Sequence, residues 1–170
     1  MPSPIGHALG GAAAGLAVAS MPGIIWQRVA FFAVLGMLPD IDLLFGGHRG
    51  PTHSLGTSLI AGLTLLAFTR NPRLSLASAA AYGSHTLLDW LGSDSSPPIG
   101  VMALWPITRE YYESSVHVFY AVSRRYWMPG FVAHNVRALA WELVVLVPAL
   151  AVVLAGTRLV ASRTPPRANH

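Results

Sequence analysis

Histidine and aspartate side chains gather in three short segments of the sequence. The segments are residues 38–42 (LPDID), 48–54 (HRGPTHS) and 85–89 (HTLLD). Imidazole nitrogens and carboxylate oxygens together suit divalent ions such as zinc and manganese. The chain contains no cysteine, so thiolate ligands and disulfides are excluded. A protein-bound zinc ion lowers the pKa of its water to about 7 and so supplies hydroxide, which makes metal-dependent hydrolysis the chemistry that these residue types indicate.

Spacing within the segments favours a shared site. His85 and Asp89 are four residues apart, so on a helix they lie on one face, about one turn apart. That geometry suits two ligands of one ion, or a ligand and the group that orients it. Asp40 and Asp42 follow Pro39, and we expect one of them to bind metal while the other caps a helix or holds a ligand.

Five apolar stretches would have to position these residues. They are residues 5–20, 24–38, 53–68, 74–91 and 138–160. A helix that crosses a bilayer needs about 20 residues, with a range of about 17–25, so only the fifth stretch has ample length. The first four would be short spans, re-entrant helices or parts of a half-buried bundle. Thr52 is expected to cap the third helix, with His53 in its first turn.

Threading the stretches alternately across a membrane brings the candidate ligands to one side. We name this side face A, and it receives His7, Asp40, Asp42, His48, His53, His85 and Asp89. The opposite side, face B, receives Arg28, Arg70 and Arg73. Ionisable groups at membrane depth are costly and are functional candidates by default, so their gathering on face A indicates a site there.

Composition points to a membrane protein. Apolar residues make up 53% of the 170 residues and charged residues only 11%, against about 25% charged in soluble domains. An ordinary soluble enzyme is therefore disfavoured. Net charge is +4, but the eleven arginines are scattered and there is no lysine, which argues against a nucleic-acid partner. We predict an all-α integral membrane bundle of about four to five helices.

The remaining segments are expected to lie at the membrane surface or beyond it. Residues 92–136 are rich in proline, tryptophan and tyrosine, which is typical of an interfacial segment, and residues 109–127 are expected to form an amphipathic helix on the membrane. Residues 1–161 would form one membrane-embedded domain, and residues 162–170 a disordered tail. Glu142, inside the fifth stretch, needs a partner, either Arg137 or a group in the bundle.

The clustered motifs resemble the YdjM-like family of membrane-bound, metal-dependent hydrolases. The resemblance rests on residues 38–42, 48–54 and 84–89 (SHTLLD), and His7 and residues 104–106 (LWP) also match. It covers about residues 5–108, without the fifth stretch and the tail. It implies a metal centre in a helical membrane protein and a hydrolytic activity, and it leaves the substrate open.

A looser similarity is to the zinc-dependent phospholipase C and nuclease superfamily. Its ligand order of His, Asp, His and HxxxD is followed here by His7, Asp40, His53, His85 and Asp89. This similarity implies two or more metal ions hydrolysing a phosphoester on an all-α scaffold. The superfamily's further His and HxxxE ligands are not matched, because no glutamate follows His134 at that spacing, so a third metal is not expected.

The leading hypothesis is a membrane-bound metallohydrolase that acts on an ester or phosphoester of a lipid-like substrate. It would hold one or two divalent ions, zinc first and manganese second. The metal ligands would be His53, His85, Asp89 and Asp40, with His7 on a second ion. The catalytic candidates are Asp42, His48 and Arg49, of which Asp42 would take the proton from water and Arg49 would hold a phosphate oxygen.

Two other functions stay open. A metal-ion or proton transporter would also use a His/Asp cluster, although no polar chain continues toward face B in the sequence. A structural or haem-binding membrane protein could use paired histidines, but the neighbouring acids argue against haem. No nucleic-acid partner is expected, and the sequence does not indicate an oligomeric state.

Arginine bias gives an orientation in the inner membrane. Face B holds Arg28, Arg70, Arg73, Arg158, Arg163 and Arg167. Face A holds Arg49, Arg109, Arg124, Arg125 and Arg137. The tight turn and the tail weigh more than the long 92–136 segment, so a multi-pass protein would have face B in the cytoplasm and the metal site on the outer face.

Overall fold

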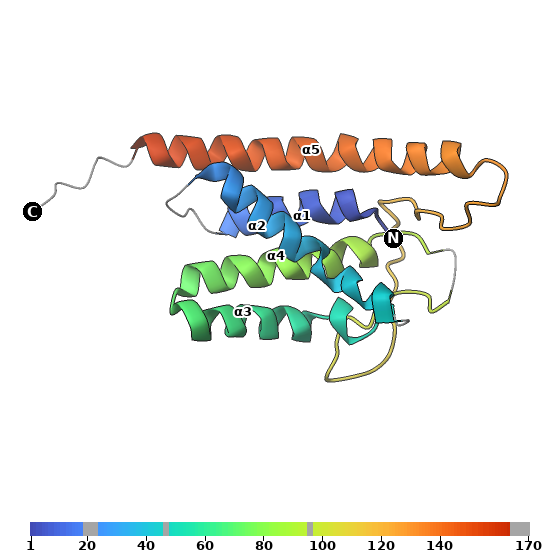
Figure 1. Cartoon of the computed structure of the whole chain (residues 1–170), viewed down its shortest axis with the longest axis horizontal. Helices are drawn as coiled ribbons and strands as arrows, with labels where there is room; N and C mark the ends of the chain where they lie inside the picture. The colour runs from blue at the N-terminus through green and yellow to red at the C-terminus, as the bar shows by residue number, and fades with distance from the viewer. Residues whose placement is uncertain (19–23, 46–47, 95–96, 164–170) are drawn as a thin grey trace, which may run out of the picture.

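The protein is an elongated set of helices with its loops gathered at one end (Figure 1). The computed structural model describes residues 1–18, 24–45, 48–94 and 97–163. Over these residues the chain forms five α-helices: α1 (Pro4–Val18), α2 (Ile25–Met37), α3 (Leu55–Thr69), α4 (Pro72–Trp90) and α5 (Phe131–Arg163). Two 3₁₀ turns, η1 (Leu38–Phe45) and η2 (Pro51–His53), lie between α2 and α3. The predicted all-α class is confirmed.

The alternating path of the helices is also as predicted. Figure 1 shows α1 and α5 starting at the same end, while the α3–α4 turn and the far end of α5 lie at the other end. Helix α1 packs against α2, α4 and α5, and α3 packs against α4. The core between them contains Leu16, Phe32, Ala77 and Ala81, all buried. This packing fixes the position of α1 and α4, the two helices that carry candidate ligands.

Local sequence signals explain where α3 and α4 begin. The Ser54 side chain accepts a hydrogen bond from the Thr57 backbone N–H at 3.0 Å, so Ser54 caps α3. The prediction that Thr52 caps this helix is wrong, because Pro51 starts the separate turn η2 and delays the α-helix to Leu55. Asn71 caps α4, with proline at the first helical position, as helix starts favour.

Helix α5 is longer than the apolar stretch that predicted it. It starts at Phe131, so residues 131–136 belong to α5 and not to the interfacial segment. It continues to Arg163, so residues 162 and 163 are helical where a disordered tail is expected; residues 164–170 lie outside the described residues. Within the described part of the chain, the stretch Phe131–Leu159 is the one helix long and apolar enough to cross a bilayer.

The outer surfaces of three helices are apolar. Exposed side chains include Trp26, Phe31 and Val34 of α2, Leu59, Ile60 and Leu63 of α3, and Val144, Val147 and Val152 of α5. Only 17% of the most apolar part of α5 is buried inside the protein, which distinguishes it from the core helix of a soluble domain. Large apolar surfaces of this kind fit contact with lipid.

The segment between α4 and α5 contains no helix in its described residues. The predicted amphipathic helix over 109–127 is therefore wrong. The chain there runs irregularly and makes isolated pairings of Val101 with Tyr112 and of Gly92 with Phe119. Aromatic and β-branched residues recur along it, and these favour extended backbone over helix. The exposed aromatic side chains of Tyr120, Tyr126 and Trp127 remain in this segment.

Glu142 on α5 finds its partner at the start of α1. Its carboxylate accepts hydrogen bonds from the Ser3 backbone N–H, at 2.7 Å, and from the Ser3 hydroxyl. The Ser3 hydroxyl oxygen in turn accepts from the Gly6 N–H at 3.1 Å, as an N-cap does. A negative charge at a helix N-terminus is also favourable for the helix dipole. The expected partner in the bundle is thus confirmed, and it positions the turn that carries His7.

Replacing Glu142 with alanine is expected to lower the free energy of unfolding by about 1–3 kcal/mol, because two buried donors at Ser3 lose their acceptor. Thermal unfolding in a neutral detergent measures the effect. Glu110→Ala is the matched control, since Glu110 is exposed and its removal leaves no buried donor. Equal stability of the two variants would contradict the capping role.

Candidate metal centre

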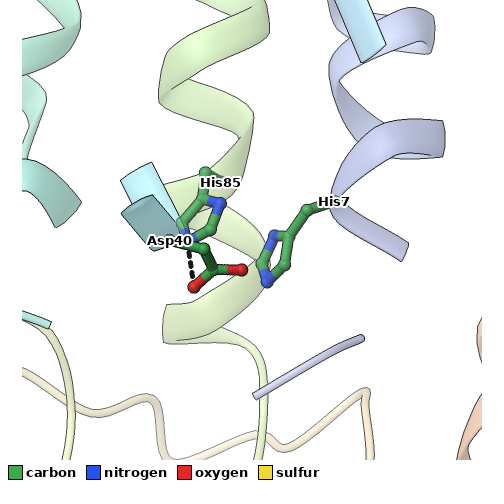
Figure 2. Close-up of side chains that lie close together, drawn as sticks. All are labelled: His7, Asp40 and His85. Carbon is green, nitrogen blue, oxygen red and sulfur yellow. Dashed lines mark ion pairs between the residues drawn. The ribbon is translucent and has the colours of Figure 1, made fainter. Parts of the chain in front are cut away.

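Four elements carry the candidate ligands to one place. His7 lies in the first turns of α1, and His85 and Asp89 lie near the end of α4. Asp40 lies in η1, which continues α2 directly because Pro39 lacks an N–H for further α-helical bonding. His53 is the last residue of η2. Figure 2 shows His7, Asp40 and His85, each from a different element, pointing toward a common centre.

Two histidines and two aspartates lie in close contact with one another. The Nε2 atom of His53 lies 3.6 Å from Asp40 Oδ1 and 3.6 Å from Asp89 Oδ2. His85 Nε2 lies 3.7 Å from the same Asp40 oxygen and 3.3 Å from the same Asp89 oxygen. Zinc bonds of about 2.0–2.1 Å place neighbouring ligand atoms about 3.0–3.4 Å apart. The four contacts lie at or slightly above this range, and His53, His85 and Asp89 form one group of mutually close donors that could hold an ion.

The same atoms are buried without hydrogen-bond partners. In the described part of the chain, Nε2 of His53, Nε2 of His85, Oδ1 of Asp40 and both Asp89 oxygens have none. Burying a polar atom without a partner is costly, and such atoms in a native protein call for an unseen partner such as an ion. These buried His and Asp groups could hold a metal ion.

Hydrogen bonds on the far side of each ring orient the two histidines. His85 Nδ1 lies 2.8 Å from the Gly36 carbonyl oxygen, and His53 Nδ1 lies 3.2 Å from Asp42 Oδ2. Both contacts need a protonated Nδ1, because the facing atoms only accept. When Nε2 of such a ring is deprotonated, it carries the free lone pair, which is the arrangement seen in metal-binding histidines.

His7 lies at the edge of this cluster. Its Nε2 atom is 3.2 Å from Asp89 Oδ1, the carboxylate oxygen that faces away from His53. Its ring stacks on that of His85, with centroids 3.7 Å apart. His7, Asp40 and His85 form a second group of mutually close donors beside His53, His85 and Asp89. The two oxygens of Asp89 thus face different histidines, an arrangement that allows a carboxylate to bridge two ions.

Comparison with known proteins identifies the family of the chain. The model of the YdjM inner membrane protein family matches residues 1–161. The chain belongs to this family. The match covers α5 as well, so it extends well past the residues 5–108 that carry the resemblance in the sequence. No curated protein and no solved structure matches the chain, and the looser similarity to the phospholipase C superfamily stays a similarity in residue order.

In this YdjM family member, Asp42 supports the cluster from behind. Its oxygens lie 3.1 Å from His48 Nδ1 and 3.2 Å from His53 Nδ1, and it accepts a hydrogen bond from the Thr52 hydroxyl at 2.7 Å. Burial acts to raise the pKa of Asp42, but these hydrogen bonds outweigh it and lower the pKa to about 2. Asp42 is therefore a charged group that orients two imidazoles, while its predicted role as proton acceptor stays a prediction.

The pKa values of His53 and Asp40 indicate that a metal ion would have to displace a proton. Burial opposes a charged His53, yet the nearby carboxylates of Asp40 and Asp42 raise the pKa of His53 to about 9. Burial likewise acts to raise the pKa of Asp40, but the contact with His53 and the nearby His85 lower it. An ion binding at His53 Nε2 therefore replaces a proton, and metal binding releases that proton to solution.

The two remaining catalytic candidates lie beside the cluster. His48 Nε2 lies 2.9 Å from Arg124 Nη2, and the ring meets that of His53 edge to face. Arg49 is buried, and its Nη2 lies 2.9 Å from Asp94 Oδ1. Its backbone adopts a left-handed φ of 63°, which is uncommon outside glycine and directs the side chain inward. The predicted contact of Arg49 with a phosphate oxygen stays a prediction.

A cavity of about 690 Å³ adjoins the cluster. Asp40 and Arg49 line it, together with parts of residues 120–134. Sequence reasoning missed two of its residues, Asp94 and Arg124, because their partners Arg49 and His48 lie about 45 and 76 positions away in the chain. The volume of the cavity lies within the usual range for small organic ligands, about 300–1,000 Å³.

Replacing Asp42 with asparagine is expected to weaken zinc binding about 10- to 100-fold without abolishing it, because His53 loses the charged acceptor that orients its ring. Competition with a zinc chelator measures the affinity. Thr52→Val removes only one of the hydrogen bonds to Asp42 and should have a smaller effect. A complete loss of zinc in Asp42→Asn would instead make Asp42 a direct ligand.

Proposed function

We propose that this protein is a membrane-bound, metal-dependent hydrolase whose substrate is an ester or phosphoester of a lipid-like molecule. The observation that supports it most is the set of buried donor atoms of His53, His85, Asp40 and Asp89, which have no hydrogen-bond partner and face one point beside a cavity. A purely structural cluster would satisfy these atoms within the protein. Membership of an inner membrane protein family supports a substrate drawn from the membrane.

In this proposal His53, His85, Asp40 and Asp89 hold zinc, or manganese in its place, and His7 joins a second ion through Asp89. The metal would supply a hydroxide nucleophile near neutral pH. Asp42 keeps His53 and His48 oriented. Arg49, held by Asp94, would contact a phosphate oxygen.

The test is hydrolysis of short-chain phosphoester and carboxylester lipids by purified protein in neutral detergent, with and without added zinc. Zinc-dependent release of product is expected from the natural protein and none from His85→Ala. An exposed histidine, His117, provides the control: it pairs with Glu113 at 3.1 Å and lies outside the cluster, so His117→Ala should keep its activity. Product release that does not depend on zinc, or that persists in His85→Ala, would reject this mechanism.

A metal-ion or proton transporter is the second candidate, favoured by the buried hydroxyl groups of Ser78 and Thr86 on α4, which have no hydrogen-bond partner in the described residues. These two groups lie on the helix that runs from the cluster toward face B. Zinc uptake into vesicles containing the protein separates the two functions. Metal-dependent uptake without product release would favour transport over hydrolysis.

We further propose that the chain crosses the inner membrane several times, with face B in the cytoplasm and the metal site on the outer face. The α3–α4 turn and the C-terminal end of α5 lie at the same end of the protein (Figure 1), so tags between Arg70 and Arg73 and after His170 should both report the cytoplasm. If both tags instead report the outer side of the membrane, face B lies outside and the metal site faces the cytoplasm. Signals on opposite sides would contradict the up-and-down path.

A further inference from the structure

Two arginines line the cavity beside the metal cluster without a carboxylate partner. Arg124 and Arg125 are exposed and both line it. Among the residues that the structure describes, no acidic group lies within ion-pair distance of either one. The guanidinium of Arg124 instead contacts a neutral acceptor, His48 Nε2, at 2.9 Å. The arginines therefore leave uncompensated positive charge at the cavity mouth.

The acidic groups that line the same cavity are already engaged. Asp94 pairs with Arg49, at 2.9 Å from its Nη2 atom. Asp40 faces His53 and His85 in the cluster, where a bound cation would neutralise it further. The net field that a ligand meets on entering the cavity is consequently positive, which favours an anionic group.

Other parts of the wall are apolar. Leu43, Tyr120, Met128 and Phe131 contribute side chains to it, and Phe131 is the first residue of the helix long enough to cross a bilayer. The exposed aromatic residues Tyr126 and Trp127 directly follow the two arginines in sequence, and such side chains concentrate at the headgroup level of membranes. The cavity thus combines two arginines with an apolar wall, beside aromatic side chains of the kind that favour the headgroup level of membranes.

We propose that Arg124 and Arg125 bind the phosphate group of a membrane amphiphile and so select a phosphate-bearing ligand for this cavity. Guanidinium groups bind phosphate by paired charge-assisted hydrogen bonds, which suits two adjacent arginines. The apolar wall by Met128 and Phe131 would hold the adjoining alkyl chain. This inference deepens the proposed hydrolase by naming its substrate class, and it rests on that function only for the fate of the ligand after binding.

Binding of octylphosphonate to the zinc-supplied full chain in a neutral detergent tests the site, because its carbon–phosphorus bond resists hydrolysis. Titration calorimetry is expected to show saturable binding that weakens at least tenfold in R124Q/R125Q. The matched control R70Q/R73Q removes two exposed arginines from the α3–α4 turn at the opposite end and should bind as the natural protein does. R124K/R125K, which keeps the charge, should bind with intermediate affinity.

Three further ligands test whether the alkyl chain, the phosphate group and the negative charge are each needed for binding. Inorganic phosphate, octanoate and octanol should each bind at least tenfold more weakly than octylphosphonate, since each lacks the alkyl chain, the phosphate or the charge. Equal binding of inorganic phosphate would overturn the amphiphile assignment, and equal binding of octanoate would overturn selection for phosphate. Unchanged binding in R124Q/R125Q would overturn the site itself.

Metal content of every variant is measured beside the titration. If R124Q/R125Q loses its fold, the single variant R125Q carries the test, because Arg125 has no recorded side-chain contact with the cluster and should still weaken binding severalfold. A failure of hydrolysis with phosphonate binding intact would remove the proposed function and leave this site. Loss of binding specificity with hydrolysis intact would reject the arginine site and leave the proposed hydrolase function.

Discussion

Purified protein supplied with zinc is expected to retain at least one equivalent of metal after desalting, and His53→Ala and His85→Ala are each expected to lose it. Both histidines direct a free Nε2 atom at the same oxygens of Asp40 and Asp89, at 3.3–3.7 Å. Removing either ring leaves two carboxylates facing each other with one imidazole, which weakens the site and increases the repulsion between the acids. Elemental analysis of the purified variants measures the result.

His117→Ala is the control for this experiment, since that ring is exposed and lies outside the cluster. It should retain as much zinc as the natural protein. Retention of a full equivalent by both His53→Ala and His85→Ala would refute the ligand assignment. A natural protein that retains less than one equivalent after zinc or manganese supplementation would refute the metal centre altogether.

Gly36→Ala is expected to destabilise the protein by about 3 kcal/mol or more, at the upper end of what overpacking costs. A Cβ atom at Gly36 would overlap the His7 carbonyl oxygen and would lie 2.8 Å from the Gly11 Cα atom. Both obstacles are backbone, so α1 and α2 would have to separate. Because the Gly36 carbonyl also accepts the hydrogen bond from His85, metal retention should fall together with stability.

Gly156→Ala is the matched control, because a Cβ atom there meets nothing within 4 Å and α5 would gain a better helix former. It should match or exceed the natural protein in a thermal unfolding experiment and retain its metal. A Gly36→Ala variant that unfolds with the natural protein would show that α1 and α2 do not approach as closely as their two glycines allow.

Much of this arrangement follows from sequence because it depends on local patterns. The apolar stretches predicted all five helices to within a few residues at most ends, and their alternation alone brought His7, Asp40 and His85 to one face. The four-residue spacing of His85 and Asp89 predicted their shared helix face. The proline before Asp40 predicted a break, and the resulting turn separates Asp40, which faces the cluster, from Asp42, which supports His53.

Features that depend on long-range contacts were beyond sequence reasoning. Ser54 and Thr52 are both good capping residues, and only the turn η2 decides between them. Residues 109–127 are predicted to form an amphipathic helix on the membrane, yet Tyr112 and Phe119 in this range pair with Val101 and Gly92. The contact of Arg124 with His48 joins segments that no periodicity connects.

The hydrogen bonds between Ser3 and Glu142 have a consequence for how the protein is made. Ribosomal synthesis produces α1 first and α5 last. The Ser3 N–H at the start of α1 therefore lacks its acceptor, the Glu142 carboxylate, until about 140 further residues have been added. His7 lies in the first turns of α1. The hydrogen bonds that cap the turn carrying His7 can therefore form only after α5 has been synthesised.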